Sequence, residues 1–304
     1  MTLDQLLMLT TVIDLGNVKA ASQKLNKTQP AISRGLKQLE TQLDISIIDR
    51  TGYRLKLTTE GKQIYSHAKR VLAETDILRQ VTQHLSQGHE SEIRLTVDGI
   101  FDISQLTPTL AQMQKIYPHT NFIIRQEYLS GAFDALLNDE VDIAISPRQG
   151  RASKNKTLNY VYLNDHALIN VASPSLVARH PNLVSVNQIK AEYLIILQDS
   201  GSLTRDFEYG SLDGQKKWYV NDFNTKKTMI INDLGWGKLP KYLIEAELAN
   251  NQLIAIKPDG NENYILINFY AITHKILGPV ASHFWQLLQA QSNDIDNSVM
   301  NLAQ

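Results

Sequence analysis

The sequence predicts a mixed α/β chain built from an N-terminal winged helix-turn-helix module, one long helix and a two-lobe α/β region. Short helical patterns and a strand pair fill the first 58 residues, an unbroken helical pattern follows to about residue 87, and strands alternate with helices from residue 93 onward. At 304 residues the chain is long enough for two or three domains. We place their bounds at residues 1–58, 59–90 and 91–304.

The module begins with two helices, at residues 3–14 and 18–25. Apolar side chains recur at helical spacing in the first of them. From this spacing we expect Leu3, Leu6, Leu7 and either Val12 or Ile13 to face a core. A glycine and an asparagine separate the two helices, as is typical of a helix end.

The stretch KTQPAISRGLKQLE at residues 27–40 predicts a third helix with two different faces. At about 100° per residue, one apolar stripe must face a core, and its members are Ile32, Leu36, Leu39 and Leu43. The opposite arc faces outward and holds Pro30, Ser33, Arg34, Lys37 and Thr41. Thr28 can cap the start of this helix. Taken alone, the pattern also fits an ordinary amphipathic surface helix.

The surroundings of this helix favour DNA binding over that plain interpretation. The second and third helices form a pair joined by a tight turn, which is the arrangement that sets an outward face into the major groove of DNA. Residues 45–58 then predict a β-hairpin beside the helix, as in a wing. Between Asp14 and Glu40 lie five basic residues and no acid, and residues 1–90 hold twelve Lys and Arg against nine Asp and Glu.

Residues 58–87 predict one helix of about thirty residues, roughly 45 Å long. Apolar side chains recur along it at intervals of seven, at Ile64, Val71, Leu78 and Leu85. A module this small cannot cover so long a stripe, so we expect the helix to pair with its copy in a dimer. The alternative is that the helix lies along the second region of its own chain.

The remaining residues alternate between strands and helices. We expect strands at 93–97, 121–129, 141–146, 166–172, 193–197, 218–220, 253–256 and 264–273, and helices at 104–116, 132–138, 224–234, 239–250 and 279–291. Crossing strands would join a first lobe, about 91–162 with 266–304, to a second lobe at about 163–265. A cleft at the strand ends between two such lobes is the usual place for a small molecule.

Composition and motifs exclude several functions. The chain has no cysteine, which excludes disulfides, thiolate metal sites and cysteine nucleophiles. It contains no HExxH or GxSxG motif, and NDLGWGKL at residues 232–239 departs twice from a phosphate-binding loop. We expect no enzyme activity, no cofactor and no metal. Asp4 and Asp14 stand where a signal peptide would carry lysines, so we expect a cytoplasmic protein without a membrane partner.

The stretch AASQKLNKTQPAISRGLKQLETQLDISIIDRTGYRLKLTTEG resembles the N-terminal signature of LysR-type transcriptional regulators. The similarity is dense over about the first 65 residues, and later landmarks such as VDIAIS and DLGWGKLPKYLIEAELANNQL occur in the order found in that family's effector domain. The resemblance implies a transcriptional regulator that binds double-stranded DNA, dimerises through its linker helix and usually forms a dimer of dimers. It also implies two lobes like a type 2 periplasmic binding protein, with a small-molecule effector of unknown identity between them.

By position in that signature, the resemblance implies a set of DNA contacts at the third helix. The set is Thr28, Gln29, Pro30, Ser33, Arg34 and Lys37. It coincides with the outward arc derived from helical spacing. Arg50 and Arg54 would anchor the wing to the DNA backbone or minor groove, whereas Leu36, Leu39 and Glu40 are expected to be structural.

The resemblance also marks positions that contact small molecules in family members. The implied set is Gly99, Ile100, Phe101, Ser146, Pro147, Arg148, Ser200, Ser202, Arg205, Phe223 and Asn224. Ile100 departs from the family pattern, in which Ser or Thr often holds an effector carboxylate at this position. An anionic effector would therefore have to draw on Arg148 or Arg205.

A protein of another class would fit the same two lobes. A cytoplasmic two-lobe small-molecule-binding protein, with an N-terminal module that makes protein contacts alone, has the same predicted elements. Steep salt dependence of binding to duplex DNA would distinguish a regulator from this alternative.

Overall fold

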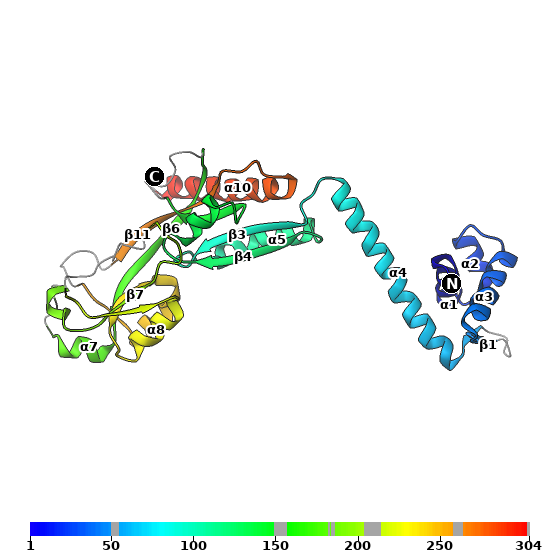
Figure 1. Ribbon diagram of the computed structural model, residues 1–304, viewed down its shortest axis with the longest axis horizontal. Coiled ribbons are helices and arrows are strands. Elements are labelled where there is room, and N and C mark those ends of the chain that lie inside the picture. The colour runs from blue at the N-terminus through cyan, green and yellow to red at the C-terminus, as the bar shows by residue number, and fades with distance from the viewer. Residues whose placement is uncertain are drawn as a thin grey trace. The chain divides into compact units, whose positions relative to one another are not determined.

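The computed structural model describes residues 1–49, 55–148, 157–181, 183, 186–203, 214–257 and 264–302. The chain divides into two compact units, Met1–Gln87 and Gly88–Gln304, and each is described by itself (Figure 1). The division falls at the end of the long helix. Among the described residues, no helix is long and apolar enough to cross a membrane.

The first unit is helical apart from a small hairpin. Its helices are α1 (Leu3–Leu15), α2 (Val18–Lys24), α3 (Gln29–Leu43) and α4 (Thr59–Ser86), and its antiparallel strands are β1 (Ile48–Asp49) and β2 (Lys56–Leu57). The predicted helix-turn-helix, wing strands and long helix are confirmed. Each of these helices begins and ends within about three residues of its expected bounds.

Local chemistry determines where these helices begin and end. Thr2, Asn17, Thr28 and Thr58 each precede a helix, and the side-chain oxygen of each accepts a hydrogen bond from a backbone N–H of the first turn. Gly16 ends α1 in the left-handed conformation, with φ 73°. The helix bounds of this unit therefore follow from neighbouring residues and need no distant contact.

One apolar cluster holds the first unit together. Leu6 and Leu9 of α1 are buried against the aliphatic stripe of α3. Helical spacing also predicts Leu3 and Leu7 in this core, but they are 45% and 41% exposed and line a hollow of about 250 Å³ with Leu72 of α4. This prediction is wrong because α1 is apolar on two faces, so spacing alone does not identify the buried one.

The apolar stripe along α4 divides into two parts. Near the start of the helix, Ala68 is buried and Ile64 packs against the core of the same unit. Farther along, Val71, Leu78 and Leu85 are 43%, 64% and 51% exposed. A single chain therefore leaves a row of large apolar side chains uncovered, at the heptad spacing that a partner helix covers.

The second unit is built on a mixed sheet with the strand order β4-β3-β5-β11-β6-β9-β7-β8, and β10 pairs with β6. The strands are β3 (Glu92–Asp98), β4 (Asn121–Glu127), β5 (Ile143–Pro147), β6 (Asn159–Ala172), β7 (Leu194–Leu197), β8 (Lys217–Val220), β9 (Trp236–Pro240), β10 (Ile254–Ala255) and β11 (Tyr264–Thr273). The helices are η1 (Ile103–Leu106), α5 (Thr107–Ile116), α6 (Gly131–Leu137), α7 (Pro174–Arg179), η2 (Val186–Ile189), α8 (Phe223–Ile231), η3 (Lys241–Leu243), α9 (Glu245–Ala249) and α10 (Pro279–Leu302).

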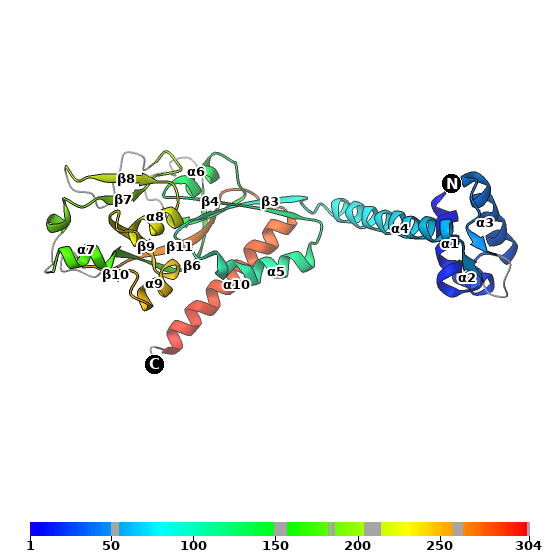
Figure 2. The ribbon, with the colours of Figure 1, turned by 90° about the horizontal axis from the view of Figure 1, so that it is seen from below.

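Two long antiparallel strands run through both lobes of this unit. β11 pairs with β6 along its whole length and also with β5 of the first lobe. On the other side, β6 pairs with β9 of the second lobe. Figure 2 shows α5 and α10 on one side of the first lobe's strands and α6 on the other. The predicted pair of α/β lobes joined by crossing strands is therefore present.

One predicted helix is wrong. Residues 239–250 do not form a single helix, because β9 occupies the start of this range and pairs with β6, and η3 and α9 follow. Gly237 lies within β9. A Cβ at Gly237 would lie 2.8 Å from the Ile195 carbonyl oxygen and 2.9 Å from Lys226 Cε, so glycine allows β9 to lie close to β7 and α8. Strand pairing overrides the helical spacing here.

The exposed row on α4 generates the first prediction. The double replacement Val71→Asp and Leu78→Asp puts two charges into this row, and a partner helix covering the row would desolvate them without a counter-ion. Light scattering should therefore report dissociation to the monomer mass, with unchanged circular dichroism. Ala73→Asp is the matched control, because Ala73 is exposed on the opposite side of the helix. A folded double mutant that keeps the wild-type mass would show that the row makes no dimer.

Candidate functional sites

Helix α3 presents a polar face that points away from the core of the first unit. Its other face is buried, with Ile32, Leu36 and Leu39 all at 4% exposure or less. Every predicted DNA-contacting residue of the helix and its cap is exposed: Thr28, Gln29, Pro30, Ser33, Arg34 and Lys37. Within the described chain neither Arg34 nor Lys37 forms an ion pair, so both charges are available to an anionic partner.

Two contacts fix α3 against its neighbours. Glu40 Oε1 accepts the backbone N–H groups of Ile47 and Ile48 at 2.9 and 3.0 Å, which ties the helix to the start of the wing. Gly35 permits close packing on α1, because a Cβ at this position would lie 2.5 Å from Met8 Sδ. The polar face is therefore carried on a helix whose position and rotation are both constrained.

In the second unit, four segments meet where strand ends of the two lobes face each other. We call this region the interlobe junction, and it comprises residues 98–102 after β3, 128–134 after β4, 198–203 after β7, and Tyr242 after β9. β3 runs parallel to β4 and β5, and β7 runs parallel to β8, so each lobe brings several carboxyl ends to this place. The Tyr242 hydroxyl crosses between the lobes and donates to the Gly99 carbonyl at 3.1 Å.

The two lobes are tied together directly at one side of the junction. Ser200 Oγ accepts the backbone N–H of Tyr128 at 2.8 Å and donates to the carbonyl of the same residue at 3.1 Å. Asp199 accepts both the backbone N–H and the hydroxyl of Ser130, at 3.0 and 2.8 Å. We call the contacts between residues 128–134 and 198–203 the interlobe latch.

One carboxylate and two glycines complete the latch. Asp134 Oδ2 accepts the hydroxyl of Ser202 at 2.8 Å. A Cβ at Gly131 would lie 2.0 Å from Ser200 Oγ, and a Cβ at Gly201 would lie 2.6 Å from Asp134 Oδ2 and 2.8 Å from the Gly131 backbone nitrogen. Larger residues at either glycine would hold the two segments apart.

Asp98 is a buried carboxylate at the end of β3 that makes a hydrogen bond with one of its two oxygens. Oδ1 accepts the backbone N–H of Ile100 at 2.8 Å. Oδ2 is buried and has no hydrogen-bond partner among the described residues. Burial raises the pKa of Asp98 to about 7, opposed by the Ile100 hydrogen bond and reinforced by the charge of Asp199 on the other lobe.

Aromatic rings lie around the same strand ends. His166 of β6 is 7% exposed, and its ring centroid lies 5.0 Å from that of Phe101 and 6.0 Å from that of Tyr242. Its Nε2 is buried without a partner in the described part of the chain, and burial lowers the pKa of His166, so the ring is neutral at pH 7. Tyr128 packs edge-on against Phe223 at 5.7 Å.

The structure brings part of the predicted effector set to the junction. The members that lie in it or pack against it are Gly99, Ile100, Phe101, Ser200, Ser202 and Phe223. The hydroxyls of Ser200 and Ser202 are engaged in the latch and are not free for a ligand while the latch is closed. Ser146 is fully buried and donates to the Pro147 carbonyl at 3.1 Å, and Asn224 is exposed on α8.

Positive charge is scarce beside the junction in the described residues. The Arg148 guanidinium lies 5.0 Å over the ring of Tyr160. Lys226 of α8 is buried, and burial, with the charge of Lys238, lowers its pKa to about 7. No group of three His, Asp or Glu side chains among the described residues could hold a metal ion. Three predicted arginines lie outside the described residues: Arg50, Arg54 and Arg205.

Sequence reasoning misses four side chains that build the junction, namely Tyr128, His166, Asp199 and Tyr242. Asp199 follows the strand predicted at residues 193–197, so position after a strand is the signal that could have found it. Tyr128 lies inside the strand predicted at residues 121–129, whereas β4 ends at Glu127. Tyr242 falls within the wrongly predicted helix, and His166 lies inside a strand with no local pattern to mark it.

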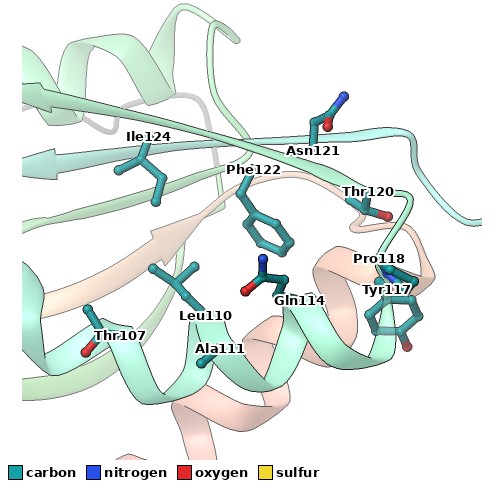
Figure 3. Close-up of a pocket in the computed structure, with 10 residues that line it drawn as sticks. All are labelled: Thr107, Leu110, Ala111, Gln114, Tyr117, Pro118, Thr120, Asn121, Phe122 and Ile124. Atoms are coloured by element: carbon teal, nitrogen blue, oxygen red, sulfur yellow. The ribbon is translucent and has the colours of Figure 1, made fainter.

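A separate hollow of about 490 Å³ lies between α5 and β4 (Figure 3). Leu110 and Gln114 of α5 and Phe122 and Ile124 of β4 line it, and none of its lining residues belongs to the interlobe junction. β4 is an edge strand, and Ile123 and Ile124 are exposed along it. This surface suits contact with another protein chain better than it suits a buried small molecule.

Comparison with known proteins identifies the family. The model for bacterial regulatory helix-turn-helix proteins of the lysR family matches residues 3–62, and the model for the LysR substrate binding domain matches residues 86–293. The regulator YeeY of Escherichia coli K12 is 30% identical over 256 residues, covering 84% of this chain and 82% of that protein. The activator AllS of Klebsiella pneumoniae is 26% identical over 247 residues, covering 81% and 91%. Full-length LysG of Corynebacterium glutamicum, solved with bound effector arginine, has the same fold, with a TM-score of 0.51 at 19% identity over 96% of this chain and 98% of that one.

The chain therefore belongs to the LysR family of transcriptional regulators. It is a DNA-binding transcriptional regulator with an N-terminal helix-turn-helix and a two-lobe effector-binding domain. The curated relatives are transcriptional regulators, not enzymes. The alternative with a module for protein contacts alone does not account for the helix-turn-helix match.

The latch generates the second prediction. Gly201→Ala puts a Cβ against the Gly131 backbone, which cannot move aside as a side chain does, so residues 198–203 must lift away. The backbone N–H groups of Tyr128 and Ser130 lose their acceptors on that segment, and their hydrogen exchange should become at least about tenfold faster. Ser200→Ala, which creates no clash, should speed exchange at Tyr128 alone. Unchanged exchange at both amides in Gly201→Ala would mean that the lobes are not held by this contact.

Proposed function

We propose that this regulator reads operator base pairs with the outward face of α3, and that a small molecule at the interlobe junction changes how the dimer holds DNA. The observation that carries the first part is the exposed polar row on α3, on the face opposite the buried Ile32, Leu36 and Leu39. Arg34 and Lys37 of this row form no ion pair among the described residues. An ordinary surface helix does not require the turn and wing that accompany α3, or two cations without an ion pair among the described residues.

The residues of this polar row are expected to play two different roles, according to their position along α3. Gln29, Ser33 and Arg34 lie in the first two turns, the part of a recognition helix that contacts base edges. A guanidinium at this place can donate two hydrogen bonds to guanine, and a glutamine can pair with adenine. Lys37 lies one turn farther along and is suited to a phosphate contact, which positions the helix without reading sequence. Thr28 and Pro30 shape the start of the helix beside the DNA backbone.

The interlobe junction is the proposed effector site because it is where groups from both lobes converge. A molecule bound there would contact residues 98–102 of one lobe and residues 198–203 or Tyr242 of the other, so its binding would bias how the lobes lie about the latch. Within the effector set, Gly99, Ile100, Phe101 and Phe223 supply the wall. We further propose that this site binds its ligand without converting it, and that the protein acts in the cytoplasm, where the chromosome lies.

Two substitutions in α3 test the first part and give the third prediction. Arg34→Ala should cost roughly 1 to 3 kcal/mol on the specific operator and relax base preference at one position. Lys37→Ala should weaken binding to all duplexes alike and flatten the logarithmic salt dependence by about one unit. Both effects are measured by fluorescence anisotropy on operator and scrambled duplexes over a salt series.

Arg70→Ala is the matched control for charge, because Arg70 is exposed on α4 and carries the same charge change away from α3. It should leave the ratio of specific to non-specific affinity unchanged. If Arg34→Ala also leaves this ratio unchanged, Arg34 does not read bases.

A further inference from the structure

We infer that the molecule bound at the interlobe junction presents a positively charged nitrogen group, an amine or a guanidinium, to Asp98. This inference rests on the proposed role of the junction as the effector site, and it names the chemical class of the effector. A carboxylate, which the family pattern at position 100 would hold, does not suit the groups present here.

The first step is the unmet hydrogen-bonding capacity of Asp98. The residue is 1% exposed, Oδ1 accepts one backbone N–H, and Oδ2 is buried without a partner among the described residues. A buried carboxylate oxygen without a donor is costly, and such groups are rare except where a ligand, ion or water supplies the donor. Nitrogen cations bring several donors, and their hydrogen bonds to carboxylates are among the strongest in proteins.

The second step is the charge that faces Asp98 from the other lobe. Asp199 lies in the loop after β7 and is close enough to disfavour the charged form of Asp98. Each lobe therefore contributes one acidic side chain to the junction, and the two charges disfavour each other. A cation placed at Asp98 relieves this repulsion and attracts both lobes at once, whereas an anion adds to it.

The third step is the ring-lined surroundings. Burial raises the pKa of Tyr128 and of Tyr242, and the negative charge of Asp98 raises both pKa values further. Both hydroxyls therefore stay protonated at neutral pH. Phe101 lies beside them, and His166 packs on Phe101 and Tyr242 with its Nε2 unpartnered. Aromatic faces beside carboxylates form a favourable setting for an organic cation.

An anion finds few partners at the same place among the described residues. Ile100 offers no hydroxyl, and the hydroxyls of Ser200 and Ser202 serve the latch. Arg148 lies over Tyr160, and Lys226 packs against Gly237 inside the second lobe. The described electrostatic neighbours that shift Asp98, Tyr128, His166 and Tyr242 are acids and a tyrosine, not cations.

Isothermal titration calorimetry on the full chain tests the inference with a graded series of probes. The cations are methylguanidinium, putrescine and agmatine, and the anions are acetate, succinate and glutarate. At least one cation should bind once per chain with millimolar or tighter affinity. Asp98→Asn keeps an oxygen to accept the Ile100 N–H, and it should weaken this cation roughly tenfold to a hundredfold. Asp139→Asn is the matched control, because Asp139 is an exposed acid of the same lobe whose φ of 62° suits asparagine.

A measurement on the wild-type chain keeps the inference testable if Asp98→Asn does not fold. A proton and the cation compete for Asp98, so the same cation should bind about tenfold more weakly at pH 6 than at pH 8. The hydroxyls of Tyr128 and Tyr242 do not titrate in this range. Equal affinity of the wild-type chain for the cation at pH 6 and pH 8 would contradict the inference. Where Asp98→Asn folds, a pH dependence that persists in it would belong to another group, such as His166 or Asp199, and would contradict the inference too.

Two further results would overturn the inference. One is binding of succinate or glutarate with an affinity that Asp98→Asn leaves unchanged, and the other is no binding by any of the three cations in the millimolar range. Either result leaves the junction itself open as an effector site. A different result would contradict the proposed function. If a ligand binds the chain but leaves the hydrogen exchange of residues 98–102 and 198–203 unchanged, it binds away from the interlobe junction.

Discussion

The antiparallel pairing of β6 with β11 is the constraint on which the effector-binding unit depends. The paired stretch runs from Tyr264 opposite Ile169 to Thr273 opposite Asn159, and it carries β5 on one side and β9 on the other. Because both lobes share this strand pair, they can twist or bend about it but cannot separate from each other. The strand ends of the two lobes are therefore kept within reach of each other, which is what makes the interlobe junction possible.

The junction contains polar groups whose hydrogen bonds are satisfied and one carboxyl group whose hydrogen bonds are not. We interpret the satisfied groups as a structural contact and the unsatisfied carboxyl as part of a binding site. The latch is well satisfied: Ser130, Asp134, Asp199 and Ser200 all have hydrogen-bond partners across the lobes. Asp98 is not, since one of its oxygens is buried without a donor in the described chain. A satisfied network stabilises one arrangement of the lobes. A buried carboxyl without a hydrogen-bond donor destabilises the same arrangement, and a ligand that supplies a donor removes this cost. Such an arrangement can respond to a ligand, because a donor supplied to Asp98 changes the free energy of the lobe arrangement that the latch holds.

Much of the DNA-binding unit could be predicted from the sequence, because its determinants are local. Thr28 caps α3 three residues before the N–H that it accepts, and the exposed and buried faces of α3 follow from the helical repeat. Local spacing failed where one helix has two apolar faces, as with Leu3 and Leu7 of α1. The sequence also named the segment after β3, but it did so through family resemblance and not through physical chemistry.

The interlobe junction could not be predicted in the same way, because its contacts join residues far apart in the chain. Tyr128 and Ser200 are separated by 72 positions, and Gly99 and Tyr242 by 143. No periodicity in the sequence relates such pairs. Ser200 and Ser202 are plausible ligand contacts from the sequence alone, and the structure shows instead that their hydroxyls bond within the latch. The predicted helix at residues 239–250 failed for a related reason, since the pairing of β9 with β6 is also non-local.

The most direct test of the account is to map the DNA sites of the full chain across its genome and footprint the sites recovered. The account predicts one enriched sequence with two related half-sites, each protected in the major groove and centred a whole number of helical turns apart, about 10.5 base pairs per turn. Recovery of duplexes with no shared sequence, or protection of a single half-site at every concentration, would contradict a dimer that reads bases with α3.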